Sequence, residues 1–582
     1  MSLPRRQWLL QATGAVAALG LGGCHRATPT WVPASGLPDH IEGQWLGPSM
    51  DRAHAWRDGQ LGGATATDGA ASSAQGDGPL KRVHTLVLGG GVAGLAAADH
   101  LQQAGLDDLV VLELEDAAGG NSRSHRMQGL ACPQGAHYLP VPGEQATDVA
   151  QWLSQQGLIH RHQGRWRGDE RHLCHSPQER LFRPDAQPAQ GHWPGHWQEG
   201  VLPFDAPDAA TLSQVRRFEA EVRQLAGALH FSLPTVHQRW QGALTTLDQQ
   251  TFAQWLDSRG YTSPALCWVL DYACRDDYGA SPQAVSAWAG LQYFASRHMM
   301  GSTVDEDHAP EGVLTWPEGN DHLIQRLVRP LGDRVQGGNV ALRIQPLRHE
   351  VLVDVWSHRR QRTERWAAKQ VVIALPLWVA RRLLPSVPEP LQAIQSLLHP
   401  SPWLVTNLLL KGLPHPRTGA PLSWDNVTYT GQGVLDVAPP ALGYVNARHQ
   451  EVTWPFGAGL WTHYWALGGS GPDQARAHRQ ALSTQPWQHW AVRVLADLAR
   501  IHPDLPEQVQ RMDLTRWGHG MITPVPGLRS HPGLQALWQP QGRLHFAHSD
   551  LSAYSVFEEA FTHGVRAARQ VLAASAVPLR TA

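Results

Sequence analysis

Lysine is nearly absent from this chain of 582 residues, in which only three of the 48 basic residues are lysines: Lys81, Lys369 and Lys411. Any chemistry that needs a lysine therefore has three candidates. Charged residues are also scarce, at 17% with a net charge of -2, whereas soluble domains average about 25%. Since a nucleic-acid-binding domain carries a basic patch or stripe, the composition predicts no nucleic-acid partner.

Motifs for metal binding are missing as well. No pair among the five cysteines forms a CxxC motif, which excludes a zinc ribbon or a thioredoxin-type site. The 32 histidines include no HExxH pair, and Pro194 and Gly195 prevent His192 and His196 from sharing one helix face. The sequence therefore predicts no metal site, and it leaves open which cysteines pair in disulfides.

Long apolar runs are absent after the first 24 residues, which excludes a multi-pass membrane protein. The start itself carries two motifs: Arg5 to Leu10 resembles the twin-arginine export signal, and Leu21 to Cys24 resembles the lipobox of bacterial lipoproteins. Residues 1–24 are therefore interpreted as a twin-arginine signal with lipobox. We expect an exported protein, in the periplasm or anchored to the membrane by lipid on Cys24, with no other membrane contact.

Residues 25–80 are rich in Gly, Ala, Ser and Pro, and this composition predicts a tether. Within them, Ile41 to Arg57 has more aromatic and charged residues and either docks onto the body or belongs to the tether. The body then begins with the apolar run Val83 to Leu88, which is typical of a buried parallel strand. A glycine-rich turn, a helix from Leu95 to Gln103 and a strand from Leu109 to Leu112 complete a β-α-β unit.

The turn of this unit carries the dinucleotide fingerprint Gly89-x-Gly91-x-x-Gly94. Gly89 allows the tight turn, Gly91 lets a pyrophosphate approach the backbone, and Gly94 permits close packing of helix on strand. The helix N-terminus offers unpaired N–H groups and a partial positive charge to the phosphates. Glu113, 19 positions after Gly94, would accept hydrogen bonds from ribose hydroxyls and repel a 2′-phosphate, so NADP is disfavoured.

The run Gly119 to Arg123, which follows Glu113, resembles the GG motif of flavin-containing amine oxidases and protoporphyrinogen-oxidase-like enzymes. The resemblance implies that four residues lie along the pyrophosphate and ribityl chain of FAD: Gly119, Gly120, Ser122 and Arg123. Three further runs resemble that superfamily in the expected order: Thr315 to Asn320, Val371 to Pro376, and Leu544 to Ala547 followed by Asp550. The resemblance of this last run implies that Asp550 and a final helix, Phe557 to Leu572, close over the flavin. The N-terminus of that helix would stabilise the negative charge of the reduced flavin.

The resemblance implies an α/β fold, with a three-part, discontinuous Rossmann-like FAD-binding domain and an interleaved α+β substrate domain. The predicted FAD-binding parts are residues 81–144, 311–398 and 541–582. The substrate domain is predicted to comprise a mostly helical part, 145–310, and a part with strands and a helix, 399–540.

The candidate catalytic residues are His519 and Tyr554. His519 is either an acid/base near neutral pH or a structural hydrogen-bonding residue. Tyr554 lies where amine oxidases place an aromatic residue facing the flavin, and it either lines the pocket or packs in the core. The charged run Arg275 to Gly279 is either a substrate clamp or a salt-bridged helix end.

One departure from the family concerns lysine. Monoamine and polyamine oxidases have a lysine, reached through a water, beside flavin N5, and the matching position here is Val405, with Lys411 further along. This departure argues against amine oxidation with oxygen as the acceptor. The C-terminal motif also lacks the cysteine through which monoamine oxidases tether their flavin, so we expect non-covalent FAD.

The leading functional prediction is an amine oxidase-like, FAD-dependent oxidoreductase in which a small organic donor delivers hydride to flavin N5. Oxygen and another oxidant both remain open as acceptors. Two alternatives are a non-redox isomerase that uses reduced flavin and a periplasmic FAD-containing assembly or scaffold lipoprotein. The sequence does not determine the oligomeric state.

Overall fold

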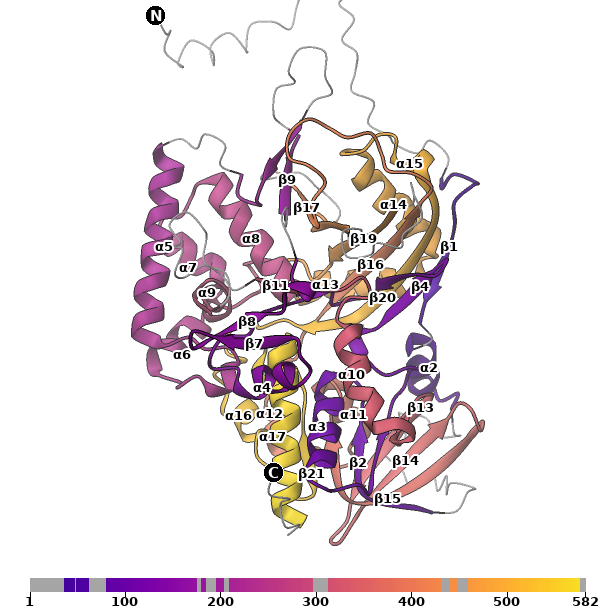
Figure 1. The fold of residues 1–582 in the computed structure, drawn as a ribbon. Helices are drawn as coiled ribbons and strands as arrows, with labels where there is room; N and C mark the ends of the chain where they lie inside the picture. Colours follow the sequence, from indigo (N-terminus) through magenta and orange to yellow (C-terminus); the bar gives the residue numbers. More distant parts are fainter. Residues whose placement is uncertain are drawn as a thin grey trace, which may run out of the picture.

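The computed structural model describes residues 36–47, 49–61, 80–174, 179–184, 195–203, 209–296, 312–430, 439–446 and 459–575. The twin-arginine run, the lipobox with Cys24 and the glycine-rich stretch 62–78 lie outside these residues. Two large sheets lie one above the other, with a group of helices beside the upper one (Figure 1). In the described part of the chain, no helix combines the length and the apolar character needed to cross a membrane.

The lower sheet is the Rossmann-like sheet that the sequence predicts. Its order is β12-β3-β2-β15-β14-β13, with β21 beside β15. Strands β12, β3, β2, β21 and the end of β15 run parallel, while β13, β14 and the start of β15 form an antiparallel meander. The bounds are β2 (Lys81–Leu88), β3 (Leu109–Leu112), β12 (Val335–Gln336), β13 (Asn339–Pro346), β14 (Val351–Ser357), β15 (Arg362–Ile373) and β21 (Leu544–Phe546).

Helices cover both faces of this sheet. One core contains α3 (Val92–Gln103), α4 (Thr147–Gln155), α10 (Asp321–Leu331) and α17 (Phe557–Ser575). The opposite core contains α11 (Leu377–Leu383), α12 (Glu389–Ala393) and α16 (Pro532–Ala536). The ring centres of Trp152 in α4 and Phe561 in α17 lie 5.4 Å apart. The stretch from residue 145, predicted to belong to the substrate domain, therefore begins with a helix that packs in the FAD-binding core.

The upper sheet has eight strands in the order β1-β20-β16-β19-β18-β17-β9-β10. Its strands are β1 (Glu42–Leu46), β9 (Glu179–Arg183), β10 (His196–Glu199), β16 (Pro400–Leu410), β17 (Asp425–Thr428), β18 (Gly443–Asn446), β19 (Gly459–Ala466) and β20 (Val509–Ile522). Helices α13 (Pro472–Thr484), α14 (Trp487–Ala499) and α15 (Leu505–Gln508) follow β19. Leu404 and Leu408 of β16 pack against Trp490 of α14 in a shared core.

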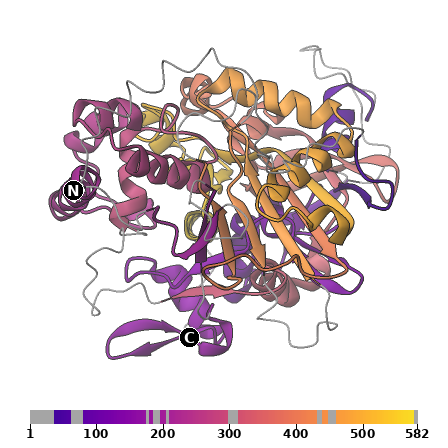
Figure 2. The ribbon, with the colours of Figure 1, turned by 90° about the horizontal axis from the view of Figure 1, so that it is seen from above.

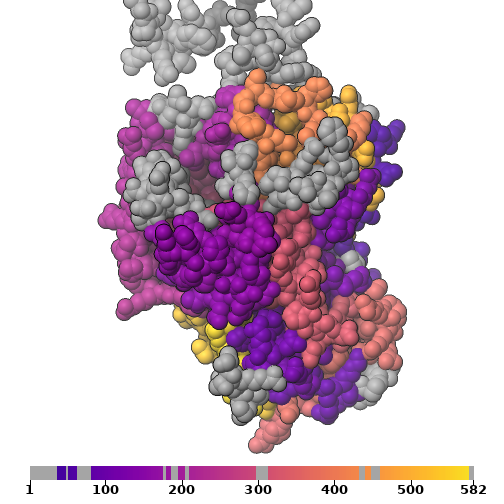
Figure 3. Space-filling model, viewed as in Figure 1, coloured from indigo at the N-terminus to yellow at the C-terminus, as the bar shows by residue number. Residues whose placement is uncertain are grey.

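The helices predicted between 145 and 310 form one group, seen from above at one side of the orange strands (Figure 2). They are α5 (Ala209–Leu229), α6 (Gly242–Asp248), α7 (Phe252–Ser258), α8 (Pro264–Tyr278) and α9 (Ala287–Ser296). Strands precede these helices in the sequence. β7 (Ile159–His162) pairs with β8 (Arg165–Gly168), and β9 then joins the upper sheet. The purple segment that contains β7 and β8 lies across the front of the molecule (Figure 3).

Three two-stranded elements complete the described fold. Their strands are β4 (Ser124–Met127) with β5 (Leu130–Pro133), β6 (Tyr138–Pro140) with β11 (Val313–Thr315), and β7 with β8. No disulfide bond joins the cysteines of the described part, which are Cys132, Cys174, Cys267 and Cys274.

Part of the predicted tether is folded onto the body. β1 pairs in parallel with β20, and α2 (Ser49–Arg57) packs beside β13. Of the two alternatives left open for Ile41 to Arg57, the structure therefore shows docking onto the body, so 25–80 is not a continuous tether. The aromatic content of the segment explains the docking, because Trp45 and Trp56 each contribute to a hydrophobic core.

Candidate active site

A cavity of about 1350 Å³ runs between the two sheets. At one end it is lined by the tips of β2 and β3, and at the other by β16, β17 and β19 of the upper sheet. It is therefore built from segments far apart in the sequence, and each end presents different chemistry.

The fingerprint glycines have the geometry that their predicted roles require. Gly89 has a φ of +101°, which only glycine adopts readily. A Cβ on Gly94 would lie 1.9 Å from the Gly89 carbonyl oxygen, so helix and strand could not approach. A Cβ on Gly91 would meet nothing within 4 Å. Since Gly91 lines the cavity, that open space is where a pyrophosphate can reach the backbone and the N-terminus of α3.

Glu113 stands at the same end of the cavity with its carboxylate fixed by the backbone. One oxygen accepts from the Gly90 N–H at 2.7 Å and the other from the Glu115 N–H at 2.9 Å. Burial raises the pKa of Glu113, while these two hydrogen bonds and Arg123 lower it. Glu113 is also tied to the start of β13, since the Asn339 N–H donates to the Glu113 carbonyl oxygen at 2.7 Å.

The GG motif lies against the fingerprint. Gly119 and Gly120 both have positive φ, +137° and +55°, and the Gly119 N–H donates to the Gly90 carbonyl oxygen at 2.7 Å. Ser122 is buried in the cavity wall. Arg123 forms an ion pair with Glu115 at 2.9 Å, and its guanidinium lies 5.3 Å from the Trp517 ring centre.

The C-terminal motif closes the same wall. Asp550 lines the cavity, and its carboxylate accepts from the Leu377 N–H at 2.9 Å, which ties the motif to the start of α11. Ser555 and Phe557 place the N-terminus of α17 at the cavity. The open approach at Gly91, the carboxylate of Glu113 and two helix N-termini fit FAD, whose phosphates and reduced flavin ring are anionic.

The other end of the cavity is an aromatic chamber. The His137 ring stacks on Tyr464 at 4.5 Å and lies 5.3 Å from Trp424. Burial lowers the pKa of His137 to about 3, so this imidazole is neutral at pH 7. The Tyr464 hydroxyl donates to the Gly135 carbonyl oxygen at 3.0 Å, which fixes its ring.

Three carboxylates from three elements meet in the wall of this chamber: Glu179 of β9, Asp276 of α8 and Asp425 of β17. The pKa of Asp425 is raised well above its usual value, first by burial and then by the charges of Glu179 and Asp276. Burial also raises the pKa of Glu179. Like charges held together in an apolar site favour a bound cation, because it removes their mutual repulsion.

No lysine of the chain reaches the cavity. Val405, the position predicted to match the family lysine, lies in the wall and is 2% exposed. Lys81 pairs with Glu364 in the lower sheet, and Lys369 and Lys411 are exposed outside the cavity.

His519 lines the cavity, but not as a proton carrier at neutral pH. Its ring stacks on Trp378 at 4.0 Å. Burial, and after it the charge of Arg479, lower its pKa to about 3. His519 is thus neutral at pH 7, which fits a structural residue and not an acid/base near neutral pH.

Of the two alternatives for Tyr554, the structure shows packing in the core, so this candidate catalytic residue does not line the cavity. Tyr554 is fully buried in the helical core, its ring lies 5.2 Å from Tyr278, and its hydroxyl donates to Asp277. Phe557, at the start of α17, is the aromatic residue of this motif that lines the cavity.

The run Arg275 to Gly279 is a salt-bridged helix end that also borders the cavity. Arg275 is buried and pairs with Asp271 at 2.7 Å, as expected of a salt-bridged helix end. Asp276 and Asp277 line the cavity.

The sequence did not identify Glu179 or Asp425, because a single acidic residue at the start of a short strand has no distinguishing pattern. Among the described residues there is no group of side chains that could hold a metal ion.

Comparison with known proteins gives a consistent picture. The profile of the flavin containing amine oxidoreductases matches residues 92–412. The chain is 23% identical to amine oxidase [flavin-containing] B of Bos taurus over 506 residues, 84% of this chain and 85% of that protein. Wild-type putrescine oxidase bound to putrescine has a TM-score of 0.59 and 17% identity, covering 85% of this chain and 100% of that chain. A CLA-producing fatty acid isomerase from P. acnes has a TM-score of 0.57 and 16% identity, covering 83% and 97%. At these identities the structural matches show a shared fold.

Proposed function

The chain belongs to the family of flavin-containing amine oxidoreductases, and on that basis we propose that it oxidises a small cationic amine. It is an FAD-dependent oxidoreductase, and because its C-terminal motif has no cysteine we expect its FAD to be bound non-covalently. The observation that carries the proposed donor is the cluster of Glu179, Asp276 and Asp425 in the wall of the aromatic chamber.

The chamber suits an ammonium group in two ways. The carboxylates supply negative charge in a buried site, where it is weakly screened. The rings of His137, Tyr464 and Trp424 supply apolar surface for the carbon chain and electron-rich faces for the cation. A fatty acid would bring its own carboxylate to this cluster, which argues against the isomerase alternative.

When bound, FAD would supply the redox chemistry, with hydride delivered to it from the carbon next to nitrogen. The protein must orient that carbon and remove the ammonium proton, because only the neutral amine gives up hydride readily. Asp425 suits the second task, since its raised pKa makes its carboxylate a better proton acceptor than an exposed one.

Anaerobic bleaching of the bound flavin tests the proposal. Monoamines, diamines and polyamines are compared with the alcohols of the same carbon skeleton, for wild type and Asp425→Asn. We expect bleaching by one amine class, none by the alcohols, and a large loss in Asp425→Asn. Turnover only after reduction with dithionite would instead favour the isomerase. An intact flavoprotein that no donor bleaches would favour the scaffold lipoprotein.

We also propose that the acceptor is an oxidant other than oxygen. The support is Val405, an aliphatic side chain in the cavity wall where the family lysine is expected, together with the lack of any other lysine there. Stopped-flow reoxidation of the reduced enzyme measures this directly. We expect slow reaction with oxygen in wild type and in the neutral control Val405→Met, and faster reaction in Val405→Lys. Rapid reoxidation of wild type by oxygen would refute it.

Finally, we propose that the protein is exported in its folded, FAD-loaded form and anchored by lipid on Cys24. The sequence support is the Arg5-Arg6 motif and the lipobox. Replacing both arginines by lysine should retain the precursor in the cytoplasm, and Cys24→Ala should move the protein from the membrane to the soluble periplasmic fraction. Export of the double-lysine variant at the wild-type rate would contradict this route.

A further inference from the structure

The N-terminal elements β1 and α2 lie next to the adenosine end of the cofactor cavity. They precede residue 92, where the family match begins. In Figure 1, α2 lies between β20 of the upper sheet and β13 of the lower one. Five residues of α2 line the cavity: Met50, Ala53, His54, Trp56 and Arg57. Across from them are Glu113 and the first residues of β13.

These elements are attached to both domains. On the substrate side, β1 adds to the edge of the upper sheet beside β20, with Glu42 opposite Arg511 and Leu46 opposite Thr515. The Arg516 guanidinium lies 4.9 Å from the Trp45 ring centre and 3.4 Å from the Asp51 carboxylate. Because β1 is the edge strand and pairs only with β20, it can detach without breaking any other strand pair of the sheet.

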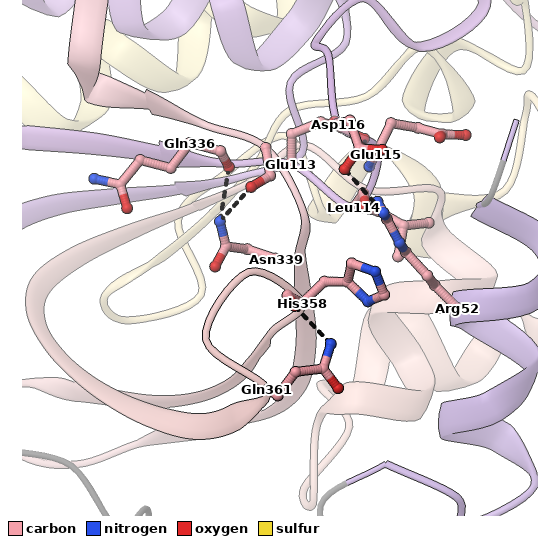
Figure 4. Close-up of polar contacts among 10 residues, drawn as sticks. Arg52, Glu113, Leu114, Glu115, Asp116, Gln336, Asn339, His358 and Gln361 are labelled. Carbon is pink, nitrogen blue, oxygen red and sulfur yellow. Dashed lines mark hydrogen bonds and ion pairs between the residues drawn. The ribbon is translucent and has the colours of Figure 1, made fainter.

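On the FAD side the attachment is a buried arginine. Arg52 is 8% exposed and donates to the Leu114 carbonyl oxygen and the Asp116 carboxylate, each at 2.8 Å (Figure 4). Leu114 and Asp116 belong to the loop that follows Glu113. The same loop supplies the Glu115 N–H that orients the Glu113 carboxylate, so Arg52 supports the group expected to bind the ribose.

We propose that β1 and α2 form a cofactor clasp, which closes over the adenosine half of FAD and must open before FAD leaves. Its occupant is the adenosine diphosphate part of the cofactor. Trp56 and Met50 offer apolar surface, and Arg57, which also pairs with Asp58 at 2.7 Å, is a cation beside an anionic ligand. Burial lowers the pKa of His54, so its imidazole offers a neutral hydrogen-bonding group. The clasp acts on cofactor retention and is independent of which donor is oxidised.

Two substitutions open the clasp from opposite ends. Arg52→Ala removes the attachment to the FAD domain. Gly43→Val prevents β1 from docking, because a Cβ on Gly43 would lie 2.2 Å from the Met512 carbonyl oxygen and 2.6 Å from the Trp487 ring. The matched control is Arg365→Ala, which removes a two-pronged ion pair with Asp354 (2.6 and 3.1 Å) in the same lower sheet but away from the cavity.

The readout is the rate of FAD release from the full-length holoenzyme, followed by the fluorescence of the freed flavin. Linked sites typically alter one another's affinity by 5–150-fold, and we expect release to be about tenfold faster or more in Arg52→Ala and Gly43→Val. Arg365→Ala should release FAD at the wild-type rate. Equal rates in all four proteins would overturn the clasp, and so would acceleration in Arg52→Ala alone, which would leave Arg52 as a positioning residue of the Glu113 loop.

Hydrogen exchange on the wild-type protein provides a second measurement that needs no substitution. Coupling between two sites is reciprocal, so bound FAD must hold the clasp closed. We expect the amides of residues 49–57 to exchange at about one tenth of the rate, or more slowly still, when FAD is bound. Equal exchange in the two forms would overturn the proposal even if a variant failed to fold.

Discussion

Alanine at Gly91 and alanine at Gly94 add the same methyl group three positions apart, yet the structure predicts opposite consequences. At Gly91 the new Cβ meets nothing within 4 Å, and the backbone φ of -76° suits any residue. At Gly94 the Cβ lies 1.9 Å from the Gly89 carbonyl oxygen and 3.1 Å from the Ala374 Cβ. Gly91→Ala should therefore disturb the cofactor, and Gly94→Ala the fold.

The expected magnitudes follow from these contacts. Surface changes without a clash alter stability by about 0.5 kcal/mol or less, so apo Gly91→Ala should melt as wild type does. Its methyl occupies the space through which the pyrophosphate approaches, and we expect FAD affinity to fall by about 10–100-fold, or 1.4–2.8 kcal/mol. Overpacking against a rigid backbone typically costs about 1–3 kcal/mol, so Gly94→Ala should lower the melting temperature of the apoprotein.

Thermal melts of the apoproteins and FAD titrations by flavin fluorescence measure the two quantities separately. In wild type and Gly94→Ala, saturating FAD should raise the melting temperature; in Gly91→Ala it should raise it less, since ligand stabilisation depends on concentration relative to Kd. Wild-type FAD affinity in Gly91→Ala would refute the placement of the pyrophosphate. An unchanged melting temperature in Gly94→Ala would refute the close packing of α3 on β2.

Three further predictions concern titratable groups. Because the Asp425 pKa is raised and a cation binds the ionised form, affinity for the donor amine should increase as the pH rises, and Asp425→Asn should remove this dependence and weaken binding by about 10–100-fold. Because the His519 pKa is about 3, His519→Asn should leave the pH–rate profile between pH 5 and 9 unchanged in shape; loss of a limb would contradict this. Burial raises the pKa of Glu559 on α17 to about 7, above its usual 4.5, so the folded state binds this proton more tightly and melting temperature should fall as the pH rises through that window. Glu559→Gln should not show that decline.

Local sequence was sufficient where function depends on consecutive residues. The fingerprint from Gly89 to Gly94, the acidic residue Glu113 and the GG motif occupy positions set by one strand, one turn and one helix. Their spacing therefore predicts their geometry, and the cavity wall contains Gly89, Gly91, Glu113, Gly120 and Arg123.

Sequence was insufficient where a side chain's direction depends on register or on distant packing. The sequence assigned Tyr554 by its distance from the C-terminal motif. In the structure a 3-10 helix, Ser549–Ser552, precedes it, and its ring is buried in the helical core. The composition of the segment that contains β1 and α2 is compatible with a linker, but Trp45 and Trp56 pack against the hydrophobic cores of two different domains.

The sequence by itself determined that this chain is a dinucleotide-binding α/β protein of the flavin-dependent kind and that lysine chemistry is restricted to three positions. Those conclusions depend on residue identity and on neighbours along the chain. Tertiary structure alone decided which groups share the cavity: Glu179, Asp276 and Asp425 come from β9, α8 and β17, and Arg52 reaches Asp116 across 64 positions. Contacts between distant segments arise when sheets and helices pack, because only then do three isolated acids become one negatively charged site.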